Sequence, residues 1–275
     1  MPARILTPTD APLVRRLLDC DPVGNVFVAS RVDAGVLNPA VPGQLYGWPS
    51  EQPTALLHLG ANLVPVAEHL DAISAFVEVV GRRRTCQSIV GPSWLALALW
   101  EALGQRWGRG YSQAREVRRR QPMMATATGP QIAADPRVQR ITMTDFESYY
   151  AASVAMYIEE VGVDPGSGPQ SSYRNYCRWL VLEGRAFGIV ADGRVIFKSD
   201  IGAASGGVAQ VQGVWLEPGL RGQGASIPAM AAVTEYVLSE YRVACLYVND
   251  FNTAAIRSYA RVGFEQVGEL ATVLF

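Results

Sequence analysis

The sequence is poor in lysine and carries almost no net charge. Lys198 is its only lysine, the remaining basic residues are arginines, and the formal net charge is −1 at pH 7. Nucleic-acid-binding domains present a basic face, so we expect no nucleic-acid partner. No run approaches the roughly 18 consecutive apolar residues of a membrane span, and residues 1–5 begin no apolar signal-peptide segment. We therefore expect a cytoplasmic protein with no membrane partner.

Residues that bind metals are also scarce. The two histidines, His58 and His69, lie far in sequence from the glycine-rich segment described below. The cysteines are scattered without the short spacings of a metal site: Cys20, Cys86, Cys177 and Cys245. This pattern predicts reduced, mostly buried thiols and no metal. It also argues against a metal-dependent hydrolase or one with a Ser-His-Asp triad.

The length and composition allow two domains. The chain has 275 residues, of which 49% are hydrophobic, so it can build more than one core. The segment 129–136 contains two prolines and a glycine and is the expected linker. We expect domains over residues 1–130 and 137–275.

Periodicity and turn residues predict the local structure. The segment 38–53 is rich in Pro and Gly and predicts a loop, and Asp192-Gly193 predicts a two-residue hairpin turn. The other main expectations are a hairpin over 54–66, a strand over 112–120 continued by 122–127, a loop over 162–168, helices over 171–182 and 253–262, and strands over 264–268 and 272–275.

The most informative segment runs from Val211 to Ala232. An apolar strand, 211–216, is ended by Glu217-Pro218-Gly219 and followed by the glycine-rich segment 221–226. Pro228 belongs in the first turn of a helix, which predicts a helix start near Gly224 or Ala225. The first N–H groups of a helix have no internal partner and carry partial positive charge. The segment therefore predicts a phosphate-binding loop.

A second pattern lies about thirty residues further on. A strand over 243–248 leads through residues 249–251 to Asn252, Ala255 and Tyr259, and then to Gly263-Phe264. Positions three or four residues apart share one face of a helix, so the three side chains are expected on one face. Asn252 either caps this helix or contacts a ligand, and Tyr259 is either a core aromatic residue or a proton donor.

Together the two patterns resemble the GNAT superfamily of N-acetyltransferases. The segment Arg221-Gly222-Gln223-Gly224-Ala225-Ser226 is similar to the coenzyme A pyrophosphate loop of that family, except that Ser226 stands where Gly or Ala is usual. Asn252, Ala255, Tyr259 and Gly263-Phe264 are similar to its second motif. The resemblance implies an α/β fold of the α+β type, with a mixed sheet.

The whole chain resembles actinobacterial two-domain GNAT proteins whose N-terminal half is a domain of unknown function. The segments that carry this likeness are 159–165, 212–215, 247–252 and 271–275. It implies tandem GNAT-like domains, of which the N-terminal one is degenerate, because the helix expected from His69 is preceded by Val66-Ala67-Glu68 and not by glycines. The run 105–110 fits the bare loop motif but follows a helix, so we interpret it as a helix end.

The resemblance also implies the roles of individual residues. Backbone groups of Val214, Trp215 and Leu216 would line the pantetheine arm, and an N–H near Val214 would polarise the thioester carbonyl. The expected coenzyme-binding residues are completed by Arg221, Gly222, Gln223, Gly224, Ala225, Ser226, Asn252, Ala255 and Tyr259. Tyr259 would also protonate the departing thiolate.

The sequence leaves the general base open. Gln210 and Gln212 stand on the strand where many relatives carry a glutamate, and an amide cannot take up a proton. Glu159 and Glu160, at the end of a helix expected to line the acceptor side, are the preferred candidates, and Glu217 and Asp200 are the alternatives. For each of these acids the competing interpretation is a solvated surface carboxylate.

The leading functional expectation is an acetyl-CoA-dependent N-acetyltransferase in which a primary amine attacks the thioester directly. The acceptor is a small molecule or a peptide, acetyl-CoA is the co-substrate and no metal takes part. Two alternatives stay open: an acyltransferase of a small-thiol pathway, since mycothiol synthase is also a tandem GNAT protein, and a coenzyme A-binding sensor or scaffold without catalysis. The sequence leaves the oligomeric state open.

Overall fold

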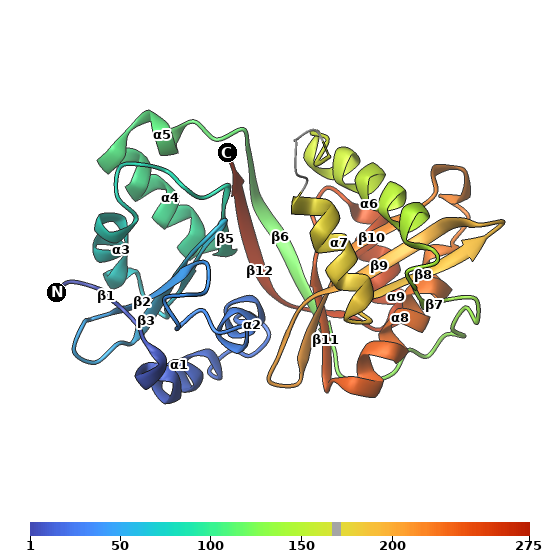
Figure 1. Ribbon diagram of the computed structural model, residues 1–275, viewed down its shortest axis with the longest axis horizontal. Helices are drawn as coiled ribbons and strands as arrows, with labels where there is room; N and C mark the ends of the chain where they lie inside the picture. Colours follow the sequence, from blue (N-terminus) through green and yellow to red (C-terminus); the bar gives the residue numbers. More distant parts are fainter. Residues whose placement is uncertain (167–171) are drawn as a thin grey trace. The chain divides into compact units, whose positions relative to one another are not determined.

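The computed structural model describes residues 1–166 and 172–275 (Figure 1). Its contacts form two compact units, and neither is one continuous stretch of chain. The first comprises Met1–Met123, Tyr247–Asn252 and Gln266–Phe275, and the second Met124–Leu246 and Thr253–Glu265. This grouping differs from the linear division at 130/137, because two segments of the C-terminal half pack with the first unit. The division into domains over residues 1–130 and 137–275 stays a prediction.

The first unit contains a mixed sheet with strand order β1-β2-β3-β4-β5-β12-β6. The pair β4 and β5 is parallel, whereas β1–β2, β2–β3, β3–β4 and β5–β12 are antiparallel. Its elements are β1 Arg4–Ile5, α1 Ala11–Leu18, α2 Val26–Asp33, β2 Gln44–Trp48, β3 Ala55–Leu59, β4 Asn62–Val66, α3 Ile73–Val80, β5 Ser88–Pro92, α4 Ser93–Trp107, α5 Arg109–Ser112, β6 Glu116–Thr126 and β12 Glu265–Leu274.

Both faces of this sheet are buried, which explains the apolar runs in its strands. Leu57 packs with Phe76 of α3 and Leu99 of α4 in one cluster. Its neighbour Leu56 points the other way, into a cluster with Val14 of α1 and residues of α2. Successive side chains of a strand alternate between faces, so a strand covered by helices on both sides needs apolar residues at consecutive positions.

Two expectations for this unit are wrong. The Pro- and Gly-rich segment 38–53 contains β2, which pairs with both β1 and β3. The segment 264–275 forms the single strand β12 instead of two strands, and β12 pairs with β5 over Leu270–Leu274. In both cases long-range pairing overrides local turn signals, because a ladder satisfies the backbone groups of weak strand formers. The hairpin over 54–66 is confirmed, and so is the continuation of the next strand past Pro122. That strand begins at Glu116 and not at Ser112, because Ser112 closes the short helix α5, where its N–H donates to the Gly108 carbonyl at 3.1 Å.

The second unit is also built on a mixed sheet, with order β11-β10-β9-β8-β7. The pair β10 and β11 is parallel and the other pairs are antiparallel. Its elements are β7 Gln139–Arg140, α6 Phe146–Val161, α7 Ser172–Leu182, β8 Ala186–Ala191, β9 Arg194–Ser205, β10 Val208–Leu216, α8 Ser226–Glu240, β11 Val243–Tyr247 and α9 Thr253–Val262. The predicted α/β fold with a mixed sheet is therefore confirmed.

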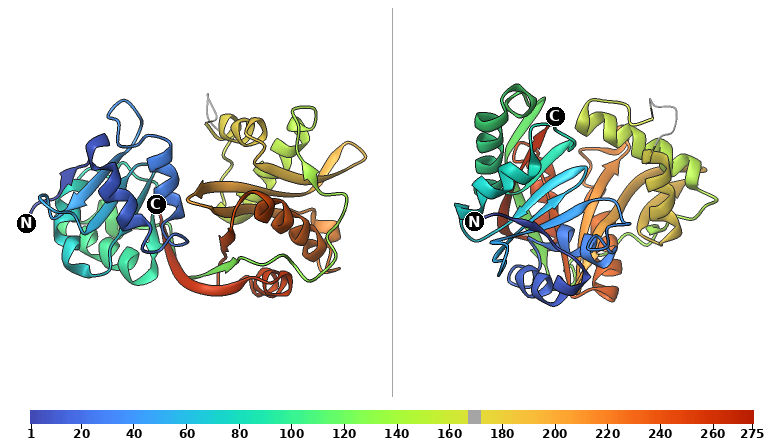
Figure 2. Two further views of the ribbon diagram at one scale, coloured as in Figure 1. Left: turned by 90° about the horizontal axis from the view of Figure 1, so that it is seen from below. Right: turned by 60° about the vertical axis from the view of Figure 1, so that its left-hand side comes forward.

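Helices cover both faces of the second sheet. Figure 2 (left) shows α6 and α7 on one face and α8 and α9 on the other. The predicted hairpin turn is confirmed, since Asp192 and Gly193 have φ of 50° and 73°, the positive values of a type I′ turn. The loop expected over 162–168 and the helix start expected at Ser171 fall partly outside the described residues. No helix among the residues described is long and apolar enough to cross a membrane.

Candidate active site

The site begins where β10 and β11 separate. Their parallel pairing covers Val208–Gln210, yet β10 continues to Leu216. A register shift against β9 lies between Gln212 and Trp215, where Gly213 has φ of 60°. We call this irregularity the Gly213 bulge. A bulge bends its strand and redirects the local backbone groups, so the free edge of β10 presents donors and acceptors toward the opening between the strands.

A short loop then leads from β10 into the next helix. After the turn Pro218–Leu220, Gly222 and Gly224 have φ of 76° and 78°. A Cβ at either glycine would meet nothing within 4 Å, so glycine is needed for the backbone conformation and not for space. The helix α8 begins at Ser226, slightly later than predicted, and Pro228 lies in its first turn as expected. No side chain caps this end of α8 in the described structure. The Ile227 N–H donates to the Gly224 carbonyl at 3.1 Å and Pro228 has no N–H, so an anion would be bound by the N–H groups up to Ser226.

Glu159 holds the arginine of this loop. A terminal nitrogen of the Arg221 guanidinium lies 2.8 and 3.1 Å from the two Glu159 carboxylate oxygens, and Arg221 Nε donates to the Leu216 carbonyl at 2.8 Å. The Trp215 indole N–H also donates to Glu159, at 3.3 Å. These contacts favour a role for Glu159 in fixing the loop against α6. Its predicted role as general base stays untested.

Tyr259 and Glu160 lie near one another. Tyr259, on α9, is 8% exposed and packs against Phe264 with ring centroids 6.2 Å apart. Burial, together with the negative charge of Glu160, raises the pKa of the Tyr259 phenol above its usual value. The phenol is therefore neutral over the physiological range and can donate a proton. The structure brings together two residues that the sequence predicted to be catalytic.

The other predicted coenzyme contacts surround the start of α9. Asn252 directly precedes this helix and is exposed, and Ala255 lies in its first turn. A hollow of about 510 Å³ lies between the start of α8 and α9, lined by Ile227, Ala254, Arg257, Ser258, Ala260 and Arg261. Among the residues described, neither Arg257 nor Arg261 forms an ion pair. Sequence reasoning missed these arginines, although their spacing of four residues on a predicted helix was the available signal.

The two alternative bases are already engaged in ion pairs. Glu217 pairs with Arg194 near the surface. Asp200 is not a surface acid, because it is 3% exposed and bound by the equally buried Lys198, whose Nζ lies 2.6 Å from Asp200 Oδ2. The side-chain amide of Gln212 donates to the Tyr176 hydroxyl at 2.7 Å. Sequence reasoning missed the burial of Lys198, because nothing local to this residue indicates it.

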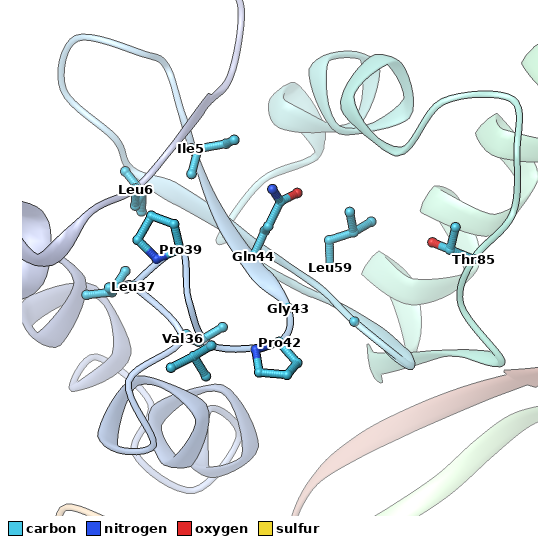
Figure 3. Close-up of a pocket in the computed structure, with 12 residues that line it drawn as sticks. Ile5, Leu6, Val36, Leu37, Pro39, Pro42, Gly43, Gln44, Leu59 and Thr85 are labelled. Atoms are coloured by element: carbon cyan, nitrogen blue, oxygen red, sulfur yellow. The ribbon is translucent and has the colours of Figure 1, made fainter.

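No comparable loop appears in the described part of the first unit. There α3 follows a 3-10 turn over Leu70–Ala72 with no glycine, and Gly108, with φ of 75°, ends α4. The run 105–110 thus contains the end of α4, as predicted, and also the start of the short helix α5 at Arg109. A cavity of about 520 Å³ in this unit (Figure 3) has no charged side chain in its lining, which includes Val36, Leu37, Pro39 and Pro42. Such a lining offers no counter-charge to a phosphate.

Described residues nowhere bring together three or more His, Cys, Asp or Glu side chains in a way that would hold a metal. Cys86, Cys177 and Cys245 are buried free thiols, whereas Cys20 is exposed.

The separating strands and the glycine-rich loop both lie in the part of the chain that matches a family of known activity. Residues 154–264 match the acetyltransferase (GNAT) family, and residues 43–149 match a domain of unknown function, DUF4081. The segment 154–264 is therefore a GNAT acetyltransferase domain by its match to the family. No curated protein matches it in sequence.

Solved structures share the fold over the whole chain at low sequence identity. A GNAT-family acetyltransferase from Colwellia psychrerythraea superposes with a TM-score of 0.58 at 11% identity, covering 100% of both chains. A GCN5-related N-acetyltransferase from Sphaerobacter thermophilus superposes with a TM-score of 0.60 at 16% identity, covering 99% of this chain and 95% of that one. A tandem GNAT protein from the clavulanic acid biosynthesis pathway superposes with a TM-score of 0.54 at 13% identity, covering 99% of this chain and 98% of that one. The tandem arrangement of GNAT-like domains is thus confirmed at the level of fold.

Proposed function

We propose that this protein is an acetyl-CoA-dependent N-acetyltransferase that acetylates a primary amine. The observation that carries the proposal is the separation of β10 from β11, followed directly by the two positive-φ glycines and the uncapped start of α8. A free strand edge suits the amide groups of pantetheine, and the helix start suits the pyrophosphate. The acceptor is either a small-molecule amine or a peptide amine.

The reaction follows from the groups at this site. The neutral amine attacks the thioester carbonyl carbon, and backbone N–H groups near Val214 stabilise the developing oxyanion. The C–S bond then breaks, and the Tyr259 phenol gives its proton to the thiolate. Burial and Glu160 favour the protonated phenol, as this role requires. Positioning of the amine and the thioester supplies much of the rate enhancement.

We assign Glu160 as the carboxylate that takes the proton from the amine, directly or through a water molecule. Glu160 lies close enough to Tyr259 for its charge to raise the phenol pKa. The proximity of Glu160 to the proposed proton donor supports this assignment.

The hollow beside α9 offers positive charge for the 3′-phosphate of coenzyme A. Arg257 and Arg261 line it together with Ile227, which belongs to the first turn of α8. Guanidinium groups bind phosphate oxygens through paired hydrogen bonds. We assign these two arginines to the 3′-phosphate, which dephospho-coenzyme A lacks.

The first test is coenzyme binding, followed by turnover. A ligand at about 100 times its dissociation constant should stabilise the protein by roughly 2.7 kcal/mol, so unfolding is followed with saturating acetyl-CoA and with dephospho-coenzyme A. We expect a clear shift with acetyl-CoA and a smaller one with the dephospho form. No shift with either would overturn the proposal.

Turnover is measured as thiol release across a panel of amines that includes a mycothiol precursor. Tyr259→Phe should lower turnover by about 10²–10⁴-fold, the usual contribution of a general acid, while acetyl-CoA affinity stays unchanged. Unchanged turnover would remove Tyr259 as the proton donor.

One observation favours a second candidate, a coenzyme A-binding sensor without catalysis. The strand β10 presents the amides Gln210 and Gln212 where a carboxylate would be expected, and the Gln212 amide is already bonded to Tyr176. This candidate predicts tight acetyl-CoA binding with no thiol release for any amine of the panel.

A further inference from the structure

The only lysine of the chain is buried in a charged cluster beneath the active-site strand. Lys198 and Asp200, both on β9, are 1% and 3% exposed, and Tyr149 of α6 is 0% exposed. Lys198 Nζ lies 2.6 Å from Asp200 Oδ2, and the Tyr149 hydroxyl donates to Asp200 Oδ1 at 2.7 Å. Each carboxylate oxygen of Asp200 therefore has its own donor. We call these three residues the buried trio.

The buried trio lies directly against the Gly213 bulge. On β9, Asp200 is opposite Gln212 and Lys198 is opposite Trp215, so one β9 residue faces the two bulged residues Gly213 and Val214. A Cβ placed on Gly213 would meet Asp200 Oδ2 at 2.8 Å and Lys198 Nζ at 3.0 Å. The backbone of the bulge thus rests on the charged pair, with no side chain between them.

Stability alone is a poor explanation for such a cluster. Taking two charges out of water costs several kcal/mol per ion, and apolar residues of similar volume often stabilise a protein equally well. Burial raises the pKa of Asp200, and Lys198 and Tyr149 oppose this rise. The pair is costly to bury, yet both of its charged atoms lie against Gly213 of the bulge, which points to a positioning role.

We propose that Tyr149, Asp200 and Lys198 are positioning residues that hold the Gly213 bulge, so that its backbone N–H groups are aimed at the thioester carbonyl of the bound acyl-coenzyme A. This inference rests on the proposed function, since it concerns the acyl end of the same ligand. None of the three residues is placed in contact with the substrate. They act through the backbone of β10.

The test observes the carbonyl itself. Acetyl-CoA labelled with ¹³C at the thioester carbonyl is bound to the protein without an amine, and the carbonyl ¹³C resonance is compared with that of free acetyl-CoA. A hydrogen bond to the carbonyl oxygen withdraws electron density from the carbon, so we expect a downfield shift in the wild type. The affinity for free coenzyme A is measured in parallel, because it depends on the loop and not on the carbonyl.

Two variants of the buried trio carry the argument. Lys198→Met combined with Asp200→Asn removes both charges without leaving either unpaired, and Tyr149→Phe removes one hydrogen bond. We expect the carbonyl shift to fall toward the free value in the double variant and partly in Tyr149→Phe, with coenzyme A affinity within about twofold of wild type. Tyr111→Phe is the matched control, because Tyr111 is also 0% exposed and its hydroxyl donates to the Gly81 carbonyl in the first unit.

A second readout needs no substitution. Because Lys198 is the only lysine, lysine labelled with ¹³C at Cε gives a single resonance. That resonance should move more on binding acetyl-CoA than on binding free coenzyme A.

The outcomes separate this inference from the proposed function. Failure of the wild type to bind coenzyme A would overturn both. Binding without a carbonyl shift, a shift that persists in folded variants of the buried trio, or equal responses of the Lys198 resonance to the two ligands would overturn the positioning role and leave the coenzyme site intact.

Discussion

Replacing Asp200 by asparagine should leave the Lys198 ammonium buried without a counter-charge. The two side chains are 4% and 1% exposed and their charged atoms lie 2.6 Å apart. Breaking a buried pair by removing one partner costs about 3–5 kcal/mol. For a protein of this size that loss corresponds to a fall in Tm on the order of 10 °C. The cost arises from the uncompensated lysine and not from lost volume, since asparagine and aspartate have nearly the same shape.

A double-mutant cycle measures this cost by urea unfolding. Asp200→Asn is expected to be the least stable variant, and adding Lys198→Met should restore most of the loss, because the uncompensated charge is then removed. The surface pair of Arg106 and Glu78, with side chains 54% and 58% exposed, is the control. Glu78→Gln should cost at most about 1 kcal/mol. If Asp200→Asn costs no more than Glu78→Gln, or if Lys198→Met rescues nothing, the buried-charge reasoning is refuted.

Two further predictions concern acid stability and the glycine loop. Burial lowers the pKa of His58 to about 4, below the value of about 6.5 in an unfolded chain, so its stabilising contribution is present above pH 6.5 and is lost as the pH falls toward 4. At about 1.4 kcal/mol per pH unit, roughly 2 kcal/mol of stability should be lost between pH 6.5 and pH 5. In urea titrations His58→Gln should remove this loss, whereas the exposed control His69→Gln should not. An equal pH dependence of stability in the two variants would contradict this prediction. Gly224→Ala forces alanine into φ of 78°, which costs about 1–2 kcal/mol, and should weaken acetyl-CoA binding in calorimetry. Gly219→Ala is its control, because a Cβ at Gly219 also meets nothing and the φ of Gly219 is not positive. Similar losses of acetyl-CoA affinity in both variants would show that coenzyme binding does not depend on the backbone conformation of the loop.

The sequence by itself determined the elements whose signals are local. The loop from Leu216 to Ser226 was predictable because only glycine adopts positive φ cheaply and because proline is tolerated in the first turn of a helix. The bounds of α9, Thr253–Val262, and the turn at Asp192-Gly193 were predictable for the same kind of reason. Each of these features depends on residues within a few positions of one another.

Tertiary structure alone decided the features that join distant segments. The strand β12 was predicted as two pieces, because its continuity depends on pairing with β5, far away in sequence. The contacts of Glu159 with Arg221 and Trp215 were not predictable, because they join α6 to a loop far away in sequence. Lys198 and Asp200 give no sign of burial in the sequence, since burial is set by α6 and by the Gly213 bulge that pack around them. Local backbone preferences fix turns and helix ends, whereas the environment of a charge depends on what the whole fold packs against it.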